Sequence, residues 1–154
     1  MRLLALDLGT RTGWALLESG QVESGVQVFD VKRGESPGMR YIAFNRWLDG
    51  LAGPALDLDL IAYEQTHQRG GAATEVAAGF ATRVQECCAL YGIEHTAVHS
   101  ATLKKWTTGR GNATKPEMMA AVRARWRHVE TDDEADAVAL LEYARAELVG
   151  SRRT

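Results

Sequence analysis

The sequence RLLALDLGTRTGWALL, residues 2–17, sets the fold of this chain. After the first arginine, its run of leucine and alanine is interrupted only by Asp7, which is typical of a buried strand. The two glycines that follow indicate a turn over residues 9–13. Short connections to the next two apolar segments predict an antiparallel three-stranded meander. The three predicted strands span residues 2–8, 12–17 and 22–31, and the third is broken at Ser24 and Gly25.

Helices and strands alternate along the rest of the chain. The spacing of apolar residues predicts a helix that opens at residues 35–38 and ends at Gly53-Pro54, with an apolar face made of Met39, Ile42, Ala43, Trp47, Leu48 and Leu51. Because helical connections join the later strands, we expect those strands to run parallel in an α/β domain with a five-stranded mixed sheet flanked by helices. The remaining predicted elements are strands over residues 58–63 and 95–98, a short helix from Ser100, and helices over residues 72–91, 115–126 and 132–149.

The composition is typical of one globular domain. The chain has 154 residues, of which 45% are apolar, and this is enough to bury a core and to exclude a disordered segment. We expect a single domain over residues 1–150 and a basic tail over residues 151–154. Cys87 and Cys88 are adjacent and cannot join distant segments, which favours reduced core positions in a cytoplasmic protein. No apolar run is long enough to cross a membrane, and no signal peptide precedes the first strand.

The charges are segregated along the chain, although the net charge is only −2. Residues 99–127 carry seven basic side chains and one acidic one, a net charge of +6. Residues 128–148 carry one basic side chain and seven acidic ones, a net charge of −6. A basic segment of this kind is either a solvated face or a phosphate-binding surface. The near-zero total therefore does not exclude a nucleic-acid partner.

Four carboxylates stand out by their positions. Asp7 and Glu64 each lie where an apolar strand ends, and a carboxylate leaving a buried sheet is costly unless it is paired or bound to a cation. Asp133 and Asp136 are three residues apart and so share one face of a predicted helix. The alternative is that these acids only cap turns and complement the helix dipole, which explains Asp133 better than Asp136.

If the four carboxylates converge, Mg²⁺ or Mn²⁺ is the expected occupant, because hard divalent ions prefer carboxylate oxygen. No cysteine and histidine spacing supports zinc. Two such ions can activate water and stabilise the leaving oxygen of a phosphoryl displacement. The chain has no evident protein nucleophile, and because it lacks a P-loop and a dinucleotide fingerprint we expect no nucleotide cofactor.

Four segments, in this order and at these spacings, resemble the RuvC family of Holliday junction resolvases within the RNase H-like superfamily. The resemblance runs from about residue 2 to residue 145, and the GWAL that follows the first motif is similar to phage or prophage members. The segments are LALDLGTRTGWAL around Asp7, IAYEQ around Glu64, LKKWTTGRGNATKPEM with Lys104 and Lys115, and DEADAVALL from Asp133.

The resemblance implies an RNase H-like fold and a magnesium-dependent endonuclease acting as a homodimer. Such an enzyme binds branched DNA and cuts four-way junctions by paired symmetric nicks, leaving 5′-phosphate and 3′-hydroxyl ends. Manganese is expected to substitute for magnesium, with two ions in each active site.

When the family's functional residues are matched to positions in this chain, the resemblance implies a set of catalytic metal ligands and two lysines that contact phosphates. The charge and loop position of other residues suggest further DNA contacts. One residue departs from the family pattern: bacterial members have a phenylalanine three residues after the glutamate, and this chain has His67, whose imidazole stacks less well on bases. The implied metal ligands are Asp7, Glu64, Asp133 and Asp136, and the expected DNA contacts are Lys104, Lys115, Lys105, Arg110, Arg69 and His67.

Other functions remain open. The first is a broader branched-DNA or flap nuclease. A YqgF-like nuclease acting on RNA has a similar first motif, but the pair Asp133 and Asp136 and the lysine segment favour the RuvC type. A junction-binding protein without catalysis is expected to lack a carboxylate, and all four are present. An actin-like ATPase needs two such domains, which 154 residues cannot supply.

Overall fold

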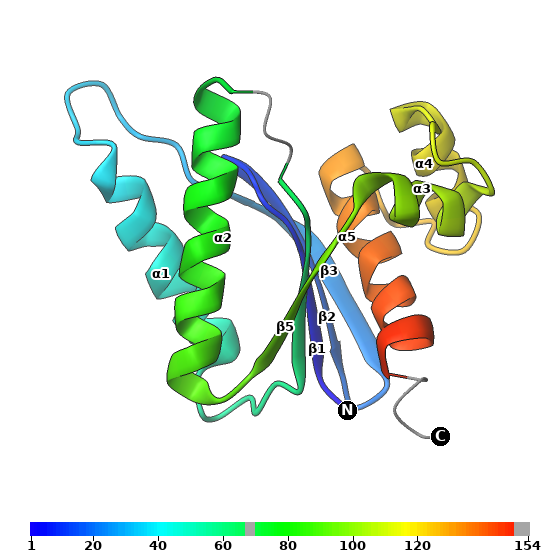
Figure 1. Ribbon diagram of the computed structural model, residues 1–154, viewed down its shortest axis with the longest axis horizontal. Helices are drawn as coiled ribbons and strands as arrows, with labels where there is room; N and C mark the ends of the chain where they lie inside the picture. The colour runs from blue at the N-terminus through cyan, green and yellow to red at the C-terminus, as the bar shows by residue number, and fades with distance from the viewer. Residues whose placement is uncertain (67–69, 150–154) are drawn as a thin grey trace.

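The computed structural model describes residues 1–66 and 70–149 of the chain. A mixed sheet with the strand order β3-β2-β1-β4-β5 forms its middle layer (Figure 1). The first three strands are antiparallel, whereas β4 and β5 run parallel to β1, as predicted. The strands are β1 (Leu3–Asp7), β2 (Arg11–Glu18), β3 (Gln21–Val28), β4 (Leu60–Glu64) and β5 (Glu94–Val98).

Helices cover both faces of this sheet. Two helices lie on one face, and α5 lies directly on the other, with α3 and α4 packed on its outer side (Figure 1). At its carboxyl end α5 continues into a short π-helix, η1. The helices are α1 (Gly38–Ala52), α2 (Ala72–Tyr91), α3 (Ser100–Thr108), α4 (Lys115–Arg123), α5 (Asp132–Tyr143) and η1 (Ala144–Val149).

The alternation of side chains along β1 separates two hydrophobic cores. Leu4 and Leu6 point into the core shared with α1 and α2. Leu3 and Ala5 point into the core shared with α5. Because successive residues of a strand face opposite sides, Asp7 continues the second series and faces α5. The sheet thus directs this carboxylate towards the helix that carries the other predicted acids.

The β2–β3 hairpin differs from the prediction in two places. The second strand begins at Arg11, one residue before its predicted start, and Gly13, where the predicted turn and the predicted strand overlap, is part of the sheet and paired with Asp7. The third strand runs unbroken through Gly25, which pairs with Trp14. A Cβ atom at Gly25 would lie 3.2 Å from the Trp14 indole, so this glycine makes room for a ring and does not interrupt the strand.

The helix α1 buries part of the predicted face. Leu48 is buried as predicted, and Trp47 and Leu51 pack against the core, but Met39 and Ile42 are 46% and 45% exposed, and Phe44 and Ala52 are buried in their place. The reason is the neighbour that α1 packs on: Phe44 stacks on Phe80 of α2 with ring centroids 4.1 Å apart. The tertiary contact therefore sets the rotation of the helix, because both faces of α1 offer apolar side chains.

The helix α2 buries the predicted face. Val76, Phe80 and Val84 are buried, and so are Cys87 and Cys88. Both cysteines are free thiols, and burial raises the pKa of Cys88 to about 12. This agrees with the prediction of reduced core positions. Among the helices of the described residues, none is both long enough and apolar enough to cross a membrane.

Candidate active site

Three of the predicted carboxylates meet at one edge of the sheet. Asp7 ends β1, Glu64 ends the neighbouring parallel strand β4, and Asp136 lies in the second turn of α5. In the register of the two strands, Leu6 pairs with Tyr63, so the next residues along each strand are side by side. One carboxylate oxygen from each of the three residues lies within 4.8 Å of the other two. Residues distant in sequence thus form one acidic cluster.

The cluster is electrostatically unfavourable without a cation. Burial raises the pKa of Asp7 well above its usual value, and the charges of Asp136 and Glu64 raise it further. Burial also raises the pKa of Asp136, to about 7, with Glu64 contributing next. Within the described residues, no lysine or arginine forms an ion pair with these three carboxylates. A donor set of closely spaced carboxylate oxygens without a protein cation fits a hard divalent ion.

Asp133 lies beside this cluster without being one of its three members. It lines the same cavity, and its Oδ2 atom is 3.7 Å from Nε of Arg11 at the start of β2. Burial raises the pKa of Asp133, whereas the charge of Arg11 lowers it. Sequence analysis missed Arg11, although it stands four residues after Asp7 in the first motif.

The two predicted phosphate-binding lysines line the cavity that holds the acids. This cavity has a volume of about 350 Å³. Nζ of Lys115 lies 3.2 Å from Oδ2 of Asp132, and this contact raises the pKa of the lysine and lowers that of the aspartate. The Lys115 side chain is 81% exposed, so a phosphate can reach it from solvent. The cavity is lined by Asp7, Glu64, Ser100, Lys104, Lys115, Met118, Asp132, Asp133 and Asp136.

The other predicted DNA contacts are not part of this cavity. Lys105 is exposed on α3, and Arg110 is exposed in the loop after α3, where it pairs with Glu117 at 3.3 Å. His67 and Arg69 lie outside the described residues.

Glu134 has an unexpected place in the structure. Glu134 does not share the helix face of Asp133 and Asp136, and only 8% of the residue is exposed. Its carboxylate accepts hydrogen bonds from the Ser24 hydroxyl at 2.8 Å and from the backbone N–H of Glu130 at 3.4 Å. Its own backbone N–H donates to the side chain of Thr131, which caps α5. The first turn of α5 is therefore held both by its cap and by the β2–β3 hairpin.

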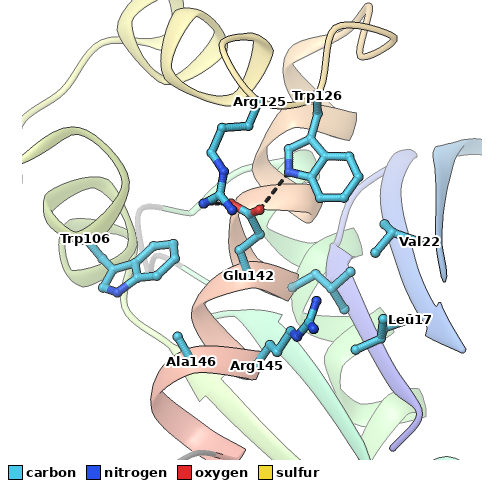
Figure 2. A pocket seen from close by; sticks show the side chains of 9 residues that line it. Leu17, Val22, Trp106, Arg125, Trp126, Glu142, Arg145 and Ala146 are labelled. Carbon is cyan, nitrogen blue, oxygen red and sulfur yellow. Dashed lines mark hydrogen bonds and ion pairs between the residues drawn. The ribbon is translucent and has the colours of Figure 1, made fainter. Parts of the chain in front are cut away.

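A separate cavity of about 460 Å³ lies near the carboxyl end of α5 (Figure 2). Figure 2 shows Trp106 and Trp126 on opposite sides of it, with Glu142 between them. Nε1 of Trp126 donates to Glu142 at 2.7 Å, and Arg125 pairs with the same carboxylate at 3.3 Å. This cavity contains none of the predicted site residues.

The sheet order and the helices on both faces can be compared with those of known proteins. They match the fold of RuvC, a mixed five-stranded sheet flanked by helices.

Two solved structures are similar to the chain over nearly its whole length. RuvC from Thermus thermophilus aligns with a TM-score of 0.71 and 21% identity, over 95% of this chain and 96% of the other. T. thermophilus RuvC in complex with a Holliday junction substrate aligns with a TM-score of 0.75 and 20% identity, over 97% of this chain and 96% of the other. No protein-family model and no curated protein matches the sequence. The likeness confirms the predicted fold.

Proposed function

We propose that this protein is a metal-dependent endonuclease that resolves four-way DNA junctions. The observation that carries the proposal is the convergence of Asp7, Glu64 and Asp136 beside two lysines in one cavity. Carboxylates that bind divalent ions, next to cationic groups that bind phosphates, suit the hydrolysis of a phosphodiester bond. The expected products carry 5′-phosphate and 3′-hydroxyl ends.

The acidic cluster fits Mg²⁺, with Mn²⁺ as a substitute, and two ions are proposed for each active site. Asp7, Glu64 and Asp136 would hold them, with Asp133 as a fourth ligand beside the cluster. Bound there, such ions supply an activated water and stabilise the charge that develops on the leaving oxygen. The fold holds the three half-buried carboxylates close together, and the raised pKa values of Asp7 and Asp136 show that their mutual repulsion is already present before a metal binds.

The cationic side chains around the cavity are proposed to hold the DNA backbone. Lys104 and Lys115 line the cavity and are placed to contact phosphates near the cut. The ion pair of Lys115 with Asp132 is on the surface, and such pairs contribute little stability, so a phosphate can compete for the lysine. Lys105 and Arg110 are proposed as further contacts outside the cavity.

The choice of branched DNA is supported by the likeness to T. thermophilus RuvC, one structure of which holds a Holliday junction substrate. A four-way junction has approximate two-fold symmetry, so a homodimer with two acidic centres suits paired symmetric cuts. We further propose that residues 1–150 form one nuclease domain.

The test is cleavage of labelled four-way, Y-shaped and linear duplex DNA with Mg²⁺ or Mn²⁺. We expect symmetric nicks on the four-way junction, lost in the variant Asp7→Asn because the amide is a poorer metal ligand. The matched control is Asp57→Asn, which makes the same chemical change at an exposed position before β4, at the far end from Glu64. The control should cut like the unmodified protein.

Each other outcome identifies another function. Equal cutting of all substrates would indicate a broader branched-DNA or flap nuclease. Cleavage of RNA alone would indicate an RNA-directed enzyme of the YqgF type. Tight junction binding without cleavage under any metal would indicate a junction-binding protein.

A further inference from the structure

The helix α5 approaches the sheet closely at the acidic end. Three small residues face it from neighbouring strands: Ala5 on β1, Ala15 on β2 and Ala62 on β4 are all fully buried in the core shared with α5. Gly13 is two residues before Ala15 on β2, so strand alternation directs its position towards α5 as well. Gly13 is also the sheet partner of Asp7. A glycine therefore lies directly beside a carboxylate of the cluster.

No side chain fits at Gly13. An added Cβ atom would lie 1.9 Å from the carbonyl oxygen of Asp133 and 3.1 Å from the backbone N–H nitrogen of Glu134. These are backbone atoms in the first turn of α5, which cannot rotate away as a flexible side chain can. The φ angle of Gly13 is not positive, so its backbone is one that any residue can adopt. Glycine is required at this position for the space that it leaves.

A second contact holds the same turn of α5 from the neighbouring strand. Ser24 of β3, which pairs with Ala15, donates its hydroxyl to Glu134 at 2.8 Å. Glu134 lies between the two acids of the helix, Asp133 and Asp136. The β2–β3 hairpin thus holds the start of α5 by the close backbone approach at Gly13 and by a partly buried hydrogen bond, in addition to the Arg11–Asp133 ion pair.

We propose that Gly13 is a positioning residue for the metal centre, assisted by the Ser24–Glu134 hydrogen bond. By leaving space for the first turn of α5, it lets Asp133 and Asp136 reach Asp7 and Glu64. This inference rests on the proposed metal-dependent function.

The expected displacement of α5 in a Gly13→Ala variant can be compared with the displacement that a bound metal ion tolerates. To fit a Cβ atom, the contact with Asp133 must open from 1.9 Å to at least 3.0 Å, a movement of about 1 Å. Metal–ligand distances tolerate changes of only about 0.2 Å, and Mg²⁺ requires nearly ideal octahedral geometry. A movement of about 1 Å in the helix that carries two of the acids therefore exceeds what the ion tolerates.

The experiment compares Mn²⁺ binding by calorimetry in the unmodified chain and in Gly13→Ala. We expect Mn²⁺ to bind at least about tenfold more weakly to the variant, in the range typical of residues that orient metal ligands. One control, Gly50→Ala, adds the same methyl group where nothing lies within 4 Å. The other, Val84→Ala, weakens the core on the opposite face of the sheet without touching α5. Both controls should bind Mn²⁺ like the unmodified chain.

A second measurement does not depend on the metal. In the metal-free Gly13→Ala variant, the backbone amide NMR signals of residues 131–136 should shift, while those of α2 stay in place. If Gly13→Ala does not fold, Ser24→Ala removes only one hydroxyl and is expected to weaken Mn²⁺ binding about threefold. In that case, unchanged Mn²⁺ affinity in Ser24→Ala would overturn the proposal.

The two proposals fail in different ways. Mn²⁺ affinity unchanged in a folded Gly13→Ala variant, or lowered equally by Val84→Ala, would show that Gly13 has no positioning role. If the unmodified chain itself does not bind Mn²⁺, the proposed metal-dependent function is wrong. The amide signals alone then test whether Gly13 positions α5, and unshifted signals in Gly13→Ala would overturn that role.

Discussion

Asp136 shows how the acidic cluster lowers the stability of the folded, metal-free protein. Its carboxyl group is largely removed from water among other acids, and burial raises its pKa from 3.8 to about 7. The folded state therefore holds this proton more tightly than the unfolded state does. It follows that ionising Asp136 lowers the stability of the metal-free protein as the pH rises from about 4 to about 7. Stability conferred by the neutral carboxyl group is present at low pH and lost at high pH.

We predict that, in the presence of a chelator, the melting temperature is higher at about pH 5.5 than at about pH 8, and that Asp136→Asn reduces this difference, while Asp7 still contributes to it. The asparagine variant should also melt higher than the unmodified protein at about pH 8, because it carries no charge at position 136. Differential scanning fluorimetry across this range measures both effects. Asp57→Asn is the control, since Asp57 is exposed. An equal pH dependence in Asp136→Asn and the unmodified protein would contradict the prediction.

At the scale of elements, α1 is joined to the rest of the molecule through an aromatic cluster on α2. Phe80 is fully buried, stacks on Phe44 at 4.1 Å and meets the edge of Phe29 at 5.4 Å. The acidic centre lies on the opposite face of the sheet, against α5. Both faces therefore carry a hydrophobic core, and the acidic cluster lies on the face with α5.

We predict that Phe80→Ala lowers the free energy of unfolding by about 3–5 kcal/mol, the usual cost of removing a fully buried phenylalanine. Urea unfolding followed by circular dichroism measures this loss. Leu90→Ala on the same helix is the control, because Leu90 is 71% exposed, and its effect should stay within about 0.5 kcal/mol. A loss below about 1 kcal/mol for Phe80→Ala would show that the aromatic cluster does not hold α1 in place.

At the scale of the whole molecule, the fold brings together charges that the sequence keeps apart. The basic residues 99–127 form α3 and α4, and both helices pack on α5, which belongs to the acidic residues 128–148. Lys115 pairs with Asp132, and Arg125 pairs with Glu142. The basic surface left for DNA is therefore smaller than the sequence suggests. Cations bound at the acidic cluster would restore part of the positive potential.

The proposed symmetric cutting predicts that the purified chain is a homodimer, with about twice the mass of the 16.8 kDa chain. The first turns of α2 expose Ala72, Ala73 and Ala78, whose small side chains permit a close approach by a second helix. Sedimentation velocity should show the dimer, and Ala78→Glu should shift it to monomer, because the change buries a charge at the contact.

The matched control for this prediction is Ala124→Glu, at an exposed position on the other side of the sheet, which should remain dimeric. A monomeric unmodified chain at micromolar concentration would contradict the prediction. A dimer unaffected by Ala78→Glu would place the contact elsewhere on the surface.

Local sequence patterns were enough to predict the helices and strands, and the strand ends at which carboxylates lie. Hydrophobic alternation and helical spacing are local patterns, so they predicted the five strands, the helix α2 with its buried face, and the positions of Asp7 and Glu64. The paired acids Asp133 and Asp136 followed from helical spacing in the same way. The alternation of side chains along a strand is also enough to place Asp7 on the same side as Leu3 and Ala5.

Which surfaces meet, and how closely, is visible only once the chain is folded. The fold brings Gly13, where the predicted turn and the predicted strand overlap, under the backbone of α5, and it buries Glu134 against Ser24. It also selected the buried face of α1 through Phe44. The physical reason is that packing distances depend on both partners of a contact. A sequence pattern describes one element at a time and so cannot show that α5 comes close enough for a single methyl group to displace it.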